Sequence, residues 1–199
     1  MKKLFLTGLM AVIFLAACEN KKNDSVSEAE KANEQKMKDS TTMAMMLDKA
    51  DEEFVVKAAA GGMEEVELGK LANEKGQLKE VKEFGEHMVK QHSMANEELK
   101  ALAMKKKITI PDSLDMDAKK TKEELMKLKG REFDKKYMNG MVDDHKKDIS
   151  EFENAANNAK DPEIKAFAEK ALPMLREHLQ MAQIADSLAK AENKGKKKM

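Results

Sequence analysis

Residues 78–107 read LKEVKEFGEHMVKQHSMANEELKALAMKKK, and their apolar side chains recur at steps of three and four residues. Val81, Phe84 and Met88 show the repeat. Such spacing places apolar side chains on one face of an α-helix and charged side chains on the other. The stretch therefore predicts a long amphipathic helix. Pro111 follows it and favours a helix end, because proline disfavours helical backbone in the residue before it.

Three further segments share this periodicity and contain few Gly or Pro residues. We expect long helices over residues 51–75, 131–159 and 161–191, because apolar spacing of this kind over such lengths is typical of amphipathic helices. The last segment begins with Asp161-Pro162. Asp favours this start because its side chain can cap the first turn, and Pro suits the first helical position.

Four helices of similar length bury their apolar faces best against one another. The expected fold class is therefore all-α, a ferritin-like four-helix bundle, in a domain over residues 48–192. Residues 108–130 connect the second long helix to the third and include a short helix expected over residues 117–129. A connection of this length can cross the bundle from end to end, which would make the second and third long helices parallel.

The first 17 residues have the features of an export signal. Lys2 and Lys3 precede an apolar run, which ends in Leu-Ala-Ala before Cys18. The run is too short to span a bilayer, and Leu15-Ala16-Ala17-Cys18 resembles the lipobox of bacterial lipoproteins. We expect residues 1–17 to be removed and Cys18 to carry a lipid that anchors the protein in the cell envelope. Glu19 after the cysteine favours the outer membrane. The alternative is an ordinary signal peptide with an accidental Cys.

Residues 18–47 contain few apolar side chains and no sustained periodicity, which predicts a flexible tether between the lipid and the domain. Residues 193–199 form a basic tail. The whole chain balances 37 Lys and Arg against 37 Asp and Glu, and no basic face argues for a nucleic-acid partner. Cys18 is the only cysteine, so the fold cannot depend on an internal disulfide.

Three of the four histidines fall on the apolar faces of three different predicted helices. They are His92, His145 and His178, and Glu65 has the equivalent place on the first helix. A rise of 1.5 Å per residue puts all four at about 16–24 Å from the hairpin turns, so they can meet near mid-bundle. Three imidazoles and a carboxylate can bind zinc, iron or copper. The alternative is a metal-free layer of buried hydrogen bonds.

Each of these histidines has a methionine one turn earlier. Met88 precedes His92, Met141 precedes His145, and Met174 precedes His178 at the same spacing. Thioether sulfur is a soft ligand, so these residues are possible additional ligands and they favour copper. The alternative is that methionine fills the core, because the chain has 17 Met and only 4% aromatic residues.

Three stretches of the predicted domain stand out: Gly61-Gly-Met-Glu-Glu-Val-Glu-Leu-Gly, Gly130-Arg-Glu-Phe-Asp and Ala171-Leu-Pro. They resemble the family of outer-membrane proteins called domain of unknown function 4142. The resemblance covers about residues 48–190 and implies a ferritin-like fold and an envelope location, without an assigned activity. It points to the same four positions as the spacing does. Gln91 stands where such proteins commonly carry Asp.

The sequence argues against a ferritin-type di-iron centre. Such centres place Glu three residues before His on two helices, whereas Val89, Val142 and Leu175 occupy these positions here. We therefore expect an envelope lipoprotein that binds one transition-metal ion. The alternative is a structural or stress-response interaction module with a metal-free His/Glu layer. An enzyme is less favoured, because no nucleophile, catalytic carboxylate pair or phosphate-binding loop stands out.

Overall fold

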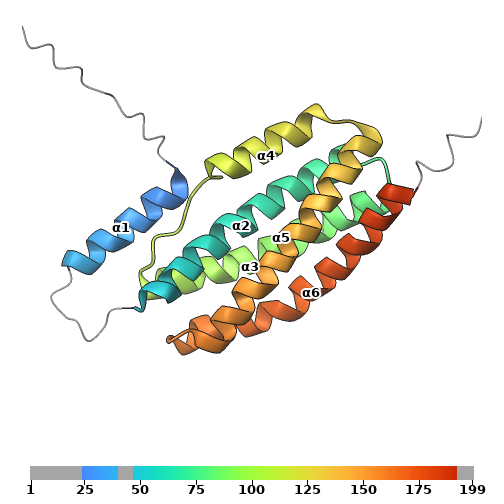
Figure 1. The fold of residues 1–199 in the computed structure, drawn as a ribbon. Helices are drawn as coiled ribbons and strands as arrows, with labels where there is room; N and C mark the ends of the chain where they lie inside the picture. Colours follow the sequence, from blue (N-terminus) through green and yellow to red (C-terminus); the bar gives the residue numbers. More distant parts are fainter. Residues whose placement is uncertain (1–23, 40–46, 192–199) are drawn as a thin grey trace, which may run out of the picture.

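The computed structural model describes residues 24–39 and 47–191, which form six helices (Figure 1). The four long helices are α2 (Lys49–Lys75), α3 (Lys79–Lys106), α5 (Gly130–Asn158) and α6 (Pro162–Ala191). The two shorter helices are α1 (Ser25–Asp39) and α4 (Met116–Lys127). The prediction of an all-α four-helix bundle is confirmed, and each of the five predicted helices ends within two residues of its expected bounds.

The four long helices form two antiparallel hairpins, α2 with α3 and α5 with α6, that pack side by side (Figure 1). The connection between the hairpins includes α4, which contacts α2 and α5. This connection returns the chain along the bundle, so α3 and α5 run in the same direction. The prediction of a long crossover with a short helix is therefore confirmed.

Two buried carboxylates tie the hairpins together. Asp134, in the first turns of α5, accepts hydrogen bonds from the backbone N–H groups of Gln77 and Leu78 in the α2–α3 turn, at 2.9 and 3.0 Å. Asp51, at the start of α2, accepts hydrogen bonds of 2.9 and 2.7 Å from Lys160 and the next residue in the α5–α6 turn. Asp51 is as far from Asp134 in the chain as Gln77 is from Lys160. The two hairpins thus make equivalent ties at the same spacing, and we call this correspondence the internal repeat.

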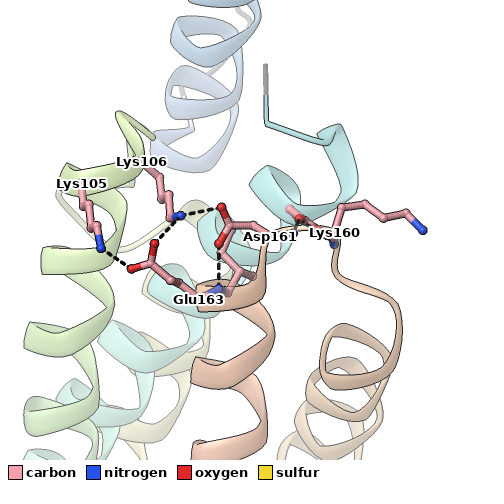
Figure 2. A network of polar contacts seen from close by, with 7 residues as sticks. Lys105, Lys106, Lys160, Asp161 and Glu163 are labelled. Carbon is pink, nitrogen blue, oxygen red and sulfur yellow. Dashed lines mark hydrogen bonds and ion pairs between the residues drawn. The ribbon is translucent and has the colours of Figure 1, made fainter. Parts of the chain in front are cut away.

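A network of charged side chains connects α3 to α6 at one end of the bundle (Figure 2). Lys106 pairs with Asp161 at 2.5 Å and with Glu163 at 2.8 Å, and Lys105 also pairs with Glu163. Asp161 caps α6 as the sequence predicted, accepting hydrogen bonds from the backbone of Glu163 and Ile164. We call these four side chains, Lys105, Lys106, Asp161 and Glu163, the terminal network.

The apolar core has two main parts, with polar side chains between them. One part surrounds Phe84 and Tyr137 and lies toward the α2–α3 turn. The other surrounds Leu99 and Ile164 and lies toward the opposite end. On α3, His92 lies between Phe84 of the first part and Leu99 of the second. The bundle therefore places its buried polar residues near mid-length.

Helix α1 corrects one prediction. The sequence predicted a flexible tether over residues 18–47, whereas Ser25–Asp39 is a helix that packs on the bundle. Ala29 and Asn33 are buried, and the Asn33 side chain exchanges hydrogen bonds of 2.9 and 2.7 Å with the backbone of Thr109. This mostly polar helix is held by bonds to the crossover, which no local periodicity reveals.

Several predictions fall outside the described residues. The signal peptide, Cys18 and the basic tail over residues 193–199 are among them. Within residues 24–39 and 47–191, we find no helix that is both long and apolar enough to cross a membrane.

Candidate metal centre

The structure brings the four predicted site residues together at mid-bundle, one from each long helix. Glu65 Oε2 lies 2.9 Å from His92 Nδ1, and Glu65 Oε1 lies 3.5 Å from His145 Nε2. His92 Nε2 lies 3.2 Å from His178 Nδ1. At most 5% of the surface of any of the four is exposed. We call Glu65, His92, His145 and His178 the His/Glu cluster.

Each imidazole has a hydrogen bond to an oxygen atom: those of His145 and His178 lead out of the cluster, and that of His92 lies within it. His145 Nδ1 donates to the backbone oxygen of Met141 at 2.9 Å. In the tautomer that matches Gln91 Oε1, His178 Nε2 donates to this oxygen at 2.8 Å, and His92 Nδ1 donates to Glu65 Oε2 at 2.9 Å. These oxygens can only accept, so in the neutral rings the inner nitrogens carry lone pairs. One ring nitrogen from each histidine lies within 4.8 Å of the others.

Two contacts inside the cluster therefore join acceptor to acceptor. Among the described residues, His145 Nε2 and Glu65 Oε1 have no hydrogen-bond partner, although both are buried. We call these two atoms the open pair. A proton on His92 Nε2 would satisfy His178 Nδ1 and make an ion pair with Glu65, but it would leave the open pair unsatisfied. A cation between Glu65 Oε1 and His145 Nε2 would satisfy the open pair.

The electrostatic surroundings favour the protonation states that bind metals. Burial, with repulsion from His92 and His145, lowers the pKa of His178 to about 3. Burial also lowers the pKa of His145, despite attraction from Glu65. Burial alone would raise the pKa of Glu65, but attraction and a hydrogen bond from His92 outweigh it and lower the pKa. Neutral imidazole and ionised carboxylate are the forms that coordinate metal ions.

The three predicted methionines lie in two environments. Met88 and Met141 are buried in the core part that surrounds Phe84 and Tyr137, which agrees with the interpretation that methionine fills the core. Met174 lines a cavity of about 40 Å³ that also reaches Glu65 and His92. Of the three, Met174 is therefore the candidate for an additional ligand.

Comparison with known proteins assigns a family to the chain. A family model described as domain of unknown function DUF4142 matches residues 25–184. The chain belongs to the DUF4142 family. This match begins at α1, so it includes the helix that the sequence pattern did not predict. No curated protein matches the chain.

A solved structure resembles this DUF4142 protein in fold. It is titled "CopM in the Cu(II)-bound form", and the TM-score is 0.55 at 13% sequence identity. The similarity covers 69% of this chain and 96% of that chain. At this identity, it shows a shared helical architecture.

The DUF4142 chain holds two further residues at the site that sequence reasoning did not assign. Gln91 accepts the outer hydrogen bond of His178. Asp148 lies on α5, one turn after His145, with ligand atoms of Glu65, His145 and Asp148 within 4.8 Å of one another. Asp148 is as far from Glu65 in the chain as Asp134 is from Asp51. The internal repeat was therefore a signal for Asp148.

Asp148 and Glu64 lie beside the cluster in a strongly acidic environment. Burial and repulsion from Glu65 and Asp144 raise the pKa of Asp148 to about 8. Burial and repulsion from Asp144, Asp115 and Glu65 raise the pKa of Glu64 to about 7. A cation bound here would relieve this repulsion.

Proposed function

We propose that this DUF4142 protein binds one transition-metal ion through Glu65, His92, His145 and His178. The observation that carries the proposal is the open pair, in which two buried acceptors face each other at 3.5 Å. An unsatisfied buried polar group costs about 1–3 kcal/mol. A bound cation would turn this unfavourable contact into two coordination bonds.

The distances and outer hydrogen bonds support the proposal. His92 Nε2 and His178 Nδ1 are 3.2 Å apart, close to the separation of about 3.3 Å between two nitrogens in a tetrahedral site with bonds of about 2.0 Å. Metal-binding histidines typically donate their other ring N–H to a carbonyl or carboxylate oxygen. The bonds from His145 to Met141 and from His178 to Gln91 follow this pattern.

The ligand types suit zinc, copper or iron. The structural neighbour is titled as a Cu(II)-bound form, which makes Cu(II) the first ion to test. A cavity of about 40 Å³ beside the cluster has room for about one water molecule. A space of this size suits the ion itself. We further propose a lipid anchor on Cys18 and an outer-membrane location, supported by the lipobox-like sequence.

The test measures metal binding by the metal-free protein with Cu²⁺, Zn²⁺ and Fe²⁺ added separately. We expect one ion bound per chain and a rise in melting temperature, because a ligand at 100 times its Kd stabilises the folded state by about 2.7 kcal/mol. His145→Leu and Glu65→Gln should lose both effects. His87→Leu is the matched control, since His87 is an exposed histidine on α3. Absence of binding, or equal loss in the control, would overturn the proposal.

A second candidate function is a structural or stress-response module with a metal-free layer. The observation in its favour is the 2.9 Å contact between His92 and Glu65, which can form a buried ion pair without metal. Elemental analysis of protein purified from its native envelope separates the two candidates. A metal-free protein whose melting temperature ignores both chelator and added metal supports the second.

A further inference from the structure

An acidic groove of about 420 Å³ runs between α2 and α5 beside the His/Glu cluster. Its carboxylates come from α2, α5 and the N-cap of α4: Glu64, Glu65, Asp115, Asp144, Asp148 and Glu151. Lys57 and Lys147 also line it, so its charge is clearly negative. Carboxylates grouped in a groove with low-dielectric walls concentrate cations and speed their arrival.

The groove leads to the cluster. Glu65, Asp148 and Glu151 line both the groove and the 40 Å³ cavity that reaches His92. Glu65 is only 5% exposed, and its Oε1 is half of the open pair. The inner end of the groove is thus a buried ligand atom that lacks a partner within the described chain, an observation independent of the surface charge.

We propose that this groove is the entry route for the metal cation, an inference that rests on the proposed function. Asp144 is exposed and Glu64 half-buried, so these two carboxylates meet the hydrated ion at the outer part of the groove. Asp148 comes next, since its ligand atom lies within 4.8 Å of those of Glu65 and His145. The ion can exchange its waters for carboxylate oxygens step by step, which lowers the cost of dehydration.

Gly61 offers a way to close this route without touching a ligand. It lies on α2 and lines both the groove and the cavity. A Cβ added at Gly61 would meet no atom of the described chain within 4 Å, whereas one at Gly62 would clash with the Asn96 side chain. A larger side chain at position 61 therefore has room to enter the passage. It should also stabilise the helix, because Gly is about 1 kcal/mol less favourable than Ala there.

The steric test compares Gly61→Leu with Gly61→Ala in the full metal-free chain, mixed rapidly with Cu²⁺ or Zn²⁺. We expect Gly61→Leu to load at least about tenfold more slowly, with melting temperature no lower than wild type and equilibrium affinity within about threefold. Gly61→Ala should load at the wild-type rate. Loading of Gly61→Leu at the wild-type rate would overturn the route.

The electrostatic test compares two pairs of substitutions that remove the same charge. Glu64→Gln with Asp144→Asn should slow loading at least about tenfold at low salt, and less at high salt where charges are screened. Glu74→Gln with Glu86→Gln is the control, because these carboxylates line a separate groove on the α2–α3 face. Equally slow metal loading in both double variants would overturn the entry route but not the metal site. A wild-type chain that binds no ion at equilibrium would overturn the site itself.

Discussion

The terminal network and the His/Glu cluster are both polar, yet they are built in opposite ways. In the terminal network, Lys106 donates to Asp161 and Glu163, and Asp161 also accepts backbone hydrogen bonds. In the cluster, the N–H groups of His145 and His178 point outward and acceptors face inward. A network whose donors and acceptors match stabilises the fold, whereas one left open at its centre has room for a cation.

The two regions also differ in their response to protons. Burial would raise the pKa of Asp161, but Lys106 and backbone N–H groups outweigh it and lower the pKa. Asp148 beside the cluster is raised to about 8 by burial and by neighbouring carboxylates. The same residue type is therefore stabilised as an anion in one region and as a neutral acid in the other.

Asp134→Ala should have the largest effect on stability, because Asp134 is a buried carboxylate that accepts two backbone hydrogen bonds. The substitution leaves the N–H groups of Gln77 and Leu78 without their acceptor. We expect the free energy of unfolding to fall by about 2–4 kcal/mol, measured by chemical denaturation. Asp143→Ala, at an exposed position on the same helix, should change it by less than about 0.5 kcal/mol. Similar losses in both variants would contradict this account.

The metal-free protein should lose stability as pH rises from about 4 to about 8. The folded state holds a proton on Asp148 up to about pH 8, while the unfolded chain releases it near pH 4. Asp148→Asn should therefore flatten the fall in melting temperature between pH 5 and 8. Asp161 acts with the opposite sign, since its lowered pKa gives stability above about pH 4 that is lost as pH falls. If the melting temperature of Asp148→Asn falls with pH as steeply as that of wild type, Asp148 does not have this role.

His145→Leu should leave the metal-free protein as stable as wild type, or more stable by about 1–2 kcal/mol. The substitution removes one of two acceptors that face each other, so it ends an unfavourable contact without leaving a new donor unpaired. The stabilisation by added metal should disappear. Thermal melts with and without Cu²⁺ or Zn²⁺ measure both effects. A metal-free variant that is strongly destabilised would show that the cluster is a closed network.

Lys106→Met should have the smallest effect on stability. Unlike His145→Leu, it should lower stability and leave metal binding unchanged. Lys106 is partly exposed in the terminal network, where ion pairs contribute at most about 1 kcal/mol. We expect a loss of about that size with or without metal, and unchanged metal affinity. Titration of the variant with Cu²⁺ checks the second point, and a changed affinity would show that the two regions are coupled.

The sequence predicted the four long helices and the meeting of four site residues, because both follow from periodicity. Helices with fixed rise and short turns determine the depth of His145 and His178 without knowledge of the packing. Helix α1 was missed because its contacts are distant in sequence: Asn33 bonds the backbone of Thr109, and Ala29 packs into the core. Gln91 was not assigned a role because its partner, His178, lies on another helix.

The cross-ties made by Asp51 and Asp134 have a consequence for assembly. Each hairpin supplies a carboxylate that accepts hydrogen bonds from the turn of the other. In a hairpin produced alone, this carboxylate would lack its hydrogen-bond donors. A second copy of the chain offers the same donors, and exchange of hairpins between two copies would restore every bond in a swapped dimer. The crossover is long enough for both hairpins of one chain to pack together, so the protein can form these bonds without exchanging hairpins.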